Sequence, residues 1–154
     1  MSCEYEKYVI RLDSISGNSW TVGSGNQGSF TTHLLTPLKK ITELCVVTTN
    51  FDASSSGSNI AYLNISQISP VFTRITNENS SRIASSIAVF NIDQTNRTIF
   101  NEKDYDNKTE FIYPLEKIDK LDIEMLDENG NILNTQSNVF ITLSVKCKRT
   151  NLCI

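Results

Sequence analysis

The sequence predicts an all-β protein of one domain, and three observations support that prediction. Ile, Val and Thr, whose branched side chains favour pleated sheet, together make up 40 of the 154 residues. Runs of alternating apolar and polar residues, which indicate half-buried strands, recur along the chain. A pattern of eight residues, Pro-Leu-x-Lys-Ile-x-x-Leu, occurs at 37–44 and again at 114–121. We therefore expect one β-domain over residues 1–154 with some internal pseudo-symmetry.

Each copy of the repeated pattern is followed by a β-prone run, at 45–49 and at 122–126. Proline cannot donate a hydrogen bond to a strand ladder, so it belongs just before a strand or at its first residue. We interpret the two copies as two equivalent strand starts. Alternation then predicts buried and outward-facing pairs in each copy: Leu44 and Val46 against Glu43 and Cys45, and Leu121 and Ile123 against Asp122 and Glu124.

The first third of the chain reads as three strands. Residues 5–13 alternate, with Tyr8, Ile10 and Leu12 on one face. Residues 14–29 form a glycine-rich loop in which Trp20 could cover a sheet edge or join an interface. A short strand at 30–35 and a longer one at 39–49 follow.

The middle of the chain gives shorter signals. The loop at 52–59 precedes strand candidates at 60–65 and 71–75, and a turn follows at 77–81. Residues 83–92 could form a short helix, although the run of Ile and Val favours a strand. An acidic, Asn-rich loop at 101–108 leads into a strand at 109–113.

The last third contains the clearest strand. Asn129-Gly130 is a strong hairpin signal between strands at 121–126 and 131–133. Residues 139–147 then alternate strictly, with Val, Ile, Leu, Val and Cys on one face. Eight or more strands at this spacing predict a sandwich or a barrel.

Composition restricts the partners and the compartment. A net charge of −3 is too small to predict a nucleic-acid or membrane partner, and we interpret the basic residues at 146–149 as a solvated strand end. The N-terminus lacks the pattern of a signal peptide, and no apolar run is long enough to span a bilayer, so we expect a soluble protein made in a cytosol-like compartment. The missing secretion signal also predicts free thiols rather than disulfides at the four cysteines, Cys3, Cys45, Cys147 and Cys153. These cysteines form no C-x-x-C and have no nearby His, which argues against zinc.

No residue pattern predicts catalysis, so we expect no enzyme, no catalytic residue, no cofactor and no metal. His33 is the only histidine and lies in a strand-like run. The Gly-x-Gly-x-x-Gly at 23–28 precedes β-prone residues, whereas a dinucleotide site requires a helix there. The turn at 127–131 imitates only the beginning of a calcium loop, which leaves a weak surface calcium site open there or at Asp104 and Asp106.

Both ends of the chain resemble a known family. Residues 8–14 and 30–44 look like the opening of the single jelly-roll minor capsid and penton proteins of nucleocytoplasmic large DNA viruses and virophages. Their pattern is a strand ending in Asp-Ser, a loop, and a Phe-led strand that runs into Pro-Leu. Residues 113–145 are similar to the closing hairpin of these proteins. The chain departs from the family at 15–17, where an Arg-rich stretch is usual, and at 49–51, where Ile-Pro is usual.

The resemblance implies an eight-stranded jelly-roll sandwich of two packed antiparallel sheets. It further implies a structural virion protein, most specifically a penton that assembles as a homopentameric ring at icosahedral vertices beside major capsid proteins. Such a protein would be assembled in the host cytoplasm and located in the virion. Trp20 and Phe51 are candidates for exposed apolar contacts between copies. The alternatives are another minor capsid or cement protein and a lectin-like attachment β-sandwich, for which Asp104, Tyr105, Asp106 and Asn107 would be the ligand-binding loop.

Overall fold

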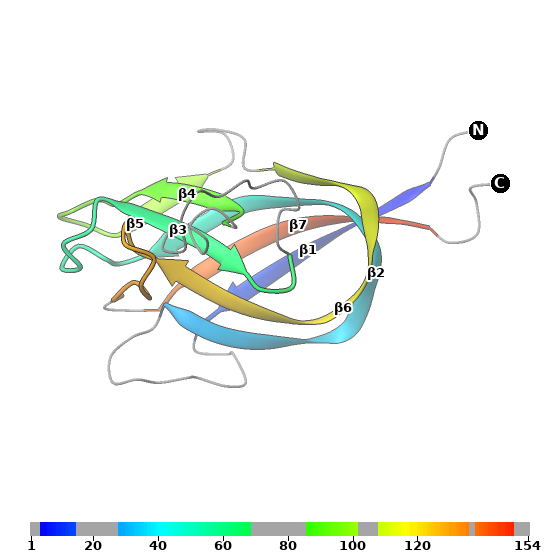
Figure 1. Ribbon diagram of the computed structural model, residues 1–154, viewed down its shortest axis with the longest axis horizontal. Coiled ribbons are helices and arrows are strands. Elements are labelled where there is room, and N and C mark those ends of the chain that lie inside the picture. Colours follow the sequence, from blue (N-terminus) through cyan, green and yellow to red (C-terminus); the bar gives the residue numbers. More distant parts are fainter. Residues whose placement is uncertain (1–3, 15–27, 69–85, 102–107, 136–137, 150–154) are drawn as a thin grey trace.

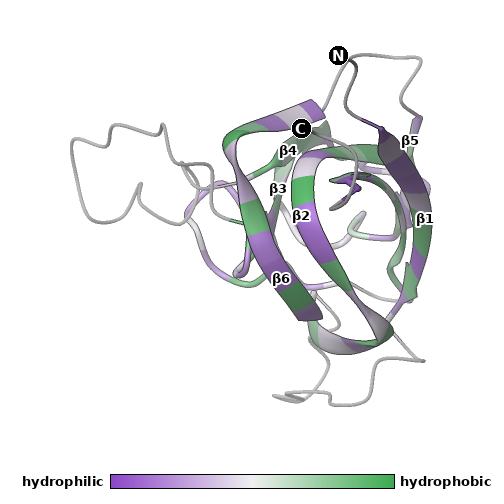
Figure 2. Ribbon diagram, turned by 90° about the vertical axis from the view of Figure 1, so that its right-hand side faces the viewer, coloured by the Kyte–Doolittle hydropathy of each residue, from purple (hydrophilic) through white to green (hydrophobic). Residues whose placement is uncertain are grey.

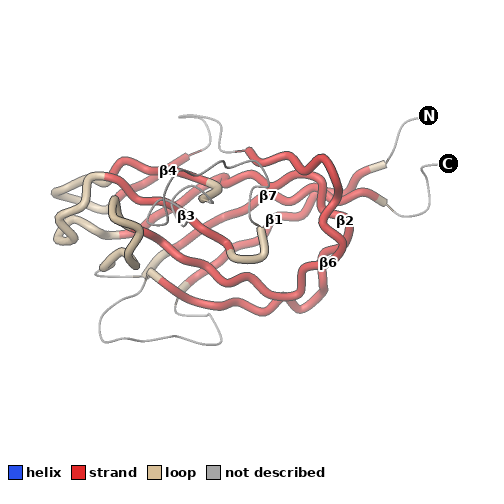
Figure 3. The backbone as a smooth tube through the Cα atoms, viewed as in Figure 1, coloured by secondary structure: helices blue, strands red, loops and turns tan. Residues whose placement is uncertain are grey.

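The structure is a computed structural model that describes residues 4–14, 28–68, 86–101, 108–135 and 138–149. All secondary-structure elements among these residues are β-strands (Figure 3), which confirms the all-β prediction. The strands are β1 (Tyr5–Asp13), β2 (Ser29–Phe51), β3 (Ile60–Ile65), β4 (Ala88–Asn91), β5 (Thr98–Asn101), β6 (Lys108–Leu126) and β7 (Phe140–Lys148). These residues include no helix that could cross a membrane.

The strands form one curled antiparallel sheet. Its order is β1-β7-β2-β6-β3-β4, and β5 pairs with β2 beside this path. The long strands β2 and β6 run next to each other and bend together (Figure 1). Viewed from the end, the bend curls the sheet into a half-barrel, with hydrophobic and hydrophilic residues alternating along both strands (Figure 2). The curl encloses the hydrophobic side of the sheet.

Both parts of β2 pair with β6, but their other neighbours differ, so β2 and β6 link two groups of strands. The first part of β2, from Ser29 to His33, pairs with the second part of β6, from Lys120 to Leu126. This part of β6 also pairs with β3, which in turn pairs with β4. The second part of β2, from Ile41 to Asn50, pairs with β7, which pairs with β1. The last residues of β2 pair with β5.

Each long strand has a bulge that ends at the proline with which the repeated pattern begins. On β2 the pairing steps from His33–Lys120 to Leu38–Ile118, so that residues 34–37 face a single residue of β6. On β6 the pairing steps from Leu115–Ile41 to Glu110–Glu43, so that residues 111–114 face a single residue of β2. A bulge bends its strand and increases the local twist. The two bulges therefore account for the shared bend of β2 and β6.

The two copies of the repeated pattern lie side by side in opposite directions. Leu38 pairs with Ile118, Lys39 with Lys117, and Ile41 with Leu115. The second position of each copy thus faces the fifth position of the other copy. This arrangement gives a local pseudo-two-fold axis close to the pair Lys39 and Lys117. The sequence predicted this pseudo-symmetry but not the direct pairing of the copies.

The interpretation of the copies as strand starts was wrong. Pro37 and Pro114 lie inside β2 and β6, each as the last residue of a bulge. A bulged residue can lack a ladder hydrogen bond, so proline does not end the strand there. The predicted strands at 30–35 and 39–49 are therefore parts of β2, and those at 109–113 and 121–126 are parts of β6.

The remaining predictions had mixed outcomes. Strands at 5–13, 60–65 and 139–147 are confirmed, and residues 88–91 are a strand, as favoured for 83–92. The Asn-Gly turn is confirmed by the hydrogen bond from Asp127 N–H to the Asn131 carbonyl at 2.8 Å, but residues 131–133 contribute only the bridge between Leu126 and Ile132. β5 was not predicted. The candidates at 71–75 and 77–81 lie outside the described residues.

The core is aliphatic along the sheet and aromatic at one end. Leu44, Val46, Leu121 and Ile123 are buried while their polar neighbours are partly exposed, as alternation predicted. At the end of β2, the ring centroids of Phe51 and Phe90 are 6.1 Å apart, and those of Phe90 and Phe100 are 5.0 Å apart. These rings come from β2, β4 and β5, so they connect both groups of strands.

Candidate interaction surface

The two bulges present matching apolar side chains. The three residues before Pro37 are Leu-Leu-Thr, and the three before Pro114 are Phe-Ile-Tyr. Leu34 and Phe111, the first of each set, are partly buried and pack against the core. The similarity of the two copies thus extends from the repeated pattern into the bulges.

The next residues in each bulge point into solvent. Leu35 is fully exposed, Ile112 is 69% exposed, and Tyr113 is 84% exposed. Exposed apolar residues are ordinary when they are scattered singly, whereas neighbouring ones indicate an interaction site. The two bulges lie at opposite ends of the paired segments 38–41 and 115–118, so Leu35 lies apart from Ile112 and Tyr113, which are adjacent in sequence. We name Leu35, Ile112 and Tyr113 the bulge surface.

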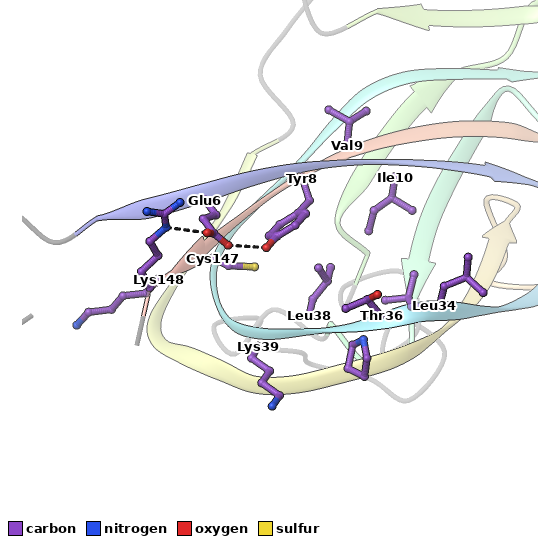
Figure 4. A pocket seen from close by; sticks show the side chains of 13 residues that line it. Glu6, Tyr8, Val9, Ile10, Leu34, Thr36, Leu38, Lys39, Cys147 and Lys148 are labelled. Atoms are coloured by element: carbon purple, nitrogen blue, oxygen red, sulfur yellow. Dashed lines mark hydrogen bonds and ion pairs between the residues drawn. The ribbon is translucent and has the colours of Figure 1, made fainter. Parts of the chain in front are cut away.

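A groove lies between β1 and the bulge of β2. Its volume is about 780 Å³. Figure 4 shows Tyr8 and Ile10 of β1 pointing towards Leu34 and Leu38 of β2, whereas Val9 points away from the groove. The groove is therefore apolar between these four side chains, whereas charged residues such as Glu6, Lys39 and Arg149 also line it. Its β1 wall is the end strand of the sheet that the described residues form.

Charged residues close one end of the groove. Arg149 donates from Nε to Glu6 at 2.7 Å and from Nη1 to Glu4 at 3.0 Å, and Tyr8 donates its hydroxyl to Glu6. The Tyr8 hydroxyl and then Arg149 hold the pKa of the Glu6 carboxyl below its usual value, and the same bond raises the pKa of Tyr8. This exposed cluster joins the beginning of β1 to the residue after β7.

A second polar cluster stiffens the pairing of β2 with β6. The carboxylate of Asp122 accepts hydrogen bonds from the Thr31 hydroxyl and from Gln67 Nε2, both at 2.6 Å. These bonds, Thr31 first, and the nearby Lys120 hold the pKa of Asp122 below its usual value. Because every partner is a protein group, we assign this cluster a structural role.

The residues weighed from sequence are not brought together in one site. His33 is exposed on β2, and Gly28, the only glycine of the 23–28 motif among the described residues, packs against backbone. The Asp127 carboxylate accepts N–H groups of Asn129 and Asn131 within its own turn. The described residues include no group of three acidic, His or Cys side chains that could hold a metal.

Two further sequence expectations concern contact residues and thiols. The prediction that Phe51 is an exposed contact residue was wrong, because its side chain is 0% exposed and packs on Phe90. Trp20, Asp104, Tyr105, Asp106 and Asn107 lie outside the described residues, as do Cys3 and Cys153. Cys147 is a free thiol, and burial raises its pKa.

Sequence reasoning missed the bulge surface. The available signal was that the repeat extends upstream of each proline, with two apolar residues in succession at 34–35 and 111–112. Two adjacent apolar residues in a strand point to opposite faces, so one of each pair had to point outward.

Comparison with known proteins adds no relative. No model of a protein family matches the chain, and no curated protein matches it.

Proposed function

We propose that this chain is a structural virion protein that assembles with copies of itself, most specifically a penton protein that forms a five-membered ring at icosahedral vertices. The bulge surface is the observation on which this proposal depends. The exposed side chains of Leu35, Ile112 and Tyr113 present apolar area to water, which does not stabilise a monomer. Burial against neighbouring copies or major capsid proteins would remove this area from water.

The strand pairing supports the jelly-roll part of the proposal. β2 and β6 pair along most of their length, and the other strands fall into two groups beside them. One group is β1, β7 and β5, beside the second part of β2; the other is β3 and β4, beside the second part of β6. A jelly roll likewise divides its strands between two antiparallel sheets. The Phe51, Phe90 and Phe100 cluster lies where the groups meet.

A ring requires a heterologous contact that closes, in which one surface of each copy meets a different surface of the next. The bulge surface supplies one of the two surfaces in this proposal. The chemistry of the proposed role is non-catalytic, since it needs only packing and shape.

The test uses negative-stain images of the purified protein and of a double variant, Leu35→Ser with Ile112→Ser. The proposal predicts five-membered rings for the wild type and their loss in the variant. Ile99→Ser is the matched control, because Ile99 is 72% exposed but pairs with Asn50 at the far end of β2. Rings that persist in the double variant would contradict the role of the bulge surface, and trimers would favour another minor capsid position.

A further inference from the structure

The hydrogen bonds of β1 show which of its backbone groups face the open edge. Arg149 N–H donates to the Glu4 carbonyl at 3.0 Å, and Ser14 N–H donates to the Val139 carbonyl at 3.0 Å. The backbone groups of Glu4 and Ser14 therefore point towards β7, and β1 pairs with β7 without a register shift from one to the other. In an antiparallel ladder, the backbone groups of successive residues point alternately towards and away from the paired strand, so those of the even-numbered residues of β1 point towards β7. The backbone groups of Lys7, Val9 and Arg11 thus point to the side of β1 on which the described part of the chain places no further strand.

We propose that this edge of β1 binds the β1 strand of a second copy of the chain, antiparallel and around a two-fold axis at Ile10. The proposal goes beyond the ring, because a two-fold contact joins copies in pairs whether or not rings form. An exposed strand edge offers a template for such pairing. The resulting continuous sheet would extend over the apolar groove, which begins at this edge.

Charge complementarity favours an axis at Ile10 over one at Lys7, Val9 or Arg11. Residues that face each other in an antiparallel pair have their side chains on the same face of the sheet. The two-fold axis must therefore pass through a pair of identical residues and not between two successive residues. With the axis at Ile10, Lys7 faces Asp13 of the second copy, and Val9 faces Arg11. With the axis at Val9, Lys7 would face Arg11, and an axis at Lys7 or Arg11 would place identical cations opposite each other. Like charges that are directly opposite destabilise a strand pair.

The neighbouring strand strengthens this choice. Lys7 already faces Lys146 of β7. A carboxylate on the other side of Lys7 would offset that repulsion, whereas a further cation would increase it. On the inner face, the axis at Ile10 brings the two Ile10 side chains together and places Tyr8 against Leu12, so that partly exposed apolar area is buried.

Val9→Pro gives the most selective test. Its N–H points to the open edge, so proline there removes a hydrogen bond of the proposed dimer and none to β7. Sedimentation equilibrium of the full chain should show dimers, or paired rings, for the wild type. Val9→Pro should reduce association at least tenfold with a nearly unchanged melting temperature. A strictly monomeric wild type, single rings only, or dimers indifferent to Val9→Pro would overturn the proposal.

Charge exchange tests the position of the axis. Lys7→Glu should weaken the dimer about tenfold, because two attractive pairs become repulsive, and adding Asp13→Lys should restore it. Tighter association of Lys7→Glu would instead indicate the axis at Val9 and overturn the proposed pairing. Loss of rings in the bulge-surface variant with retention of the edge contact would separate the two proposals.

Discussion

Gly28 is a residue whose role is steric. A Cβ placed there would lie 2.5 Å from the Leu133 carbonyl oxygen, and the Gly28 carbonyl accepts the Met125 N–H at 2.6 Å. Because both neighbours are backbone, neither can move aside easily. Gly28→Ala should therefore lower the free energy of unfolding by about 2–3 kcal/mol in urea titrations.

Gly57 provides the control for Gly28. It has a φ of 74° but no atom within 4 Å of an added Cβ. Gly57→Ala should lower the free energy of unfolding by only about 1 kcal/mol, from backbone strain alone. Equal losses in the two variants would show that the close packing at Gly28 is not what restricts it.

Asp122 should make stability depend on pH. Its pKa is lowered in the folded protein, so its contribution is fully present above the unfolded value near 4 and is lost as the pH falls through the lower folded value. Asp122→Asn should cost about 1–2 kcal/mol at neutral pH, because Thr31 and Gln67 lose an ionised acceptor. In melting experiments, the difference from wild type should shrink as the pH falls from about 6 towards about 2. A constant difference would contradict the assigned carboxylate contacts.

At the scale of strands, adjacent residues in one bulge should have separable effects. Leu34 packs against the core, while Leu35 beside it is fully exposed. Leu34→Ser should lower the free energy of unfolding by about 2 kcal/mol, whereas Leu35→Ser should change it by less than about 0.5 kcal/mol. Chemical denaturation of both variants measures the difference. Similar losses would show that the bulge does not orient the two side chains as described.

Bulges also explain which strand predictions failed. Alternation correctly gave the buried face of β7 and the inward residues that follow each repeated pattern. Phe51 is buried because the pairing with β7 shifts between Val46 and Thr48, which changes the inward positions from Leu44 and Val46 to Thr49 and Phe51. An inserted residue of this kind reverses the alternation and has no signature in composition.

At the scale of the whole molecule, the aromatic cluster joins the two groups of strands. Phe90 of β4 contacts both Phe51 of β2 and Phe100 of β5. Phe90→Ala should cost about 3–5 kcal/mol, and unfolding should remain a single transition because the groups share one core. Unfolding can be monitored by tryptophan fluorescence and by circular dichroism. Two separate unfolding transitions would contradict a shared core.

The class of the fold could be predicted from local patterns, but its closure could not. β-branched content and alternation were sufficient for an all-β domain. The pairing of Lys39 with Lys117 and the exposure of the bulge surface arise from contacts between residues far apart in the chain. Those contacts depend on register, which two short matching patterns suggest but do not determine.

The central claim is that copies of this chain assemble into closed rings. The most direct measurement is the mass of the wild-type protein in solution, by size-exclusion chromatography with light scattering over a wide range of concentration. A mass of five chains, or of ten if rings pair through β1, is the predicted result. A mass of one chain at every concentration, also in the presence of major capsid protein, would contradict it.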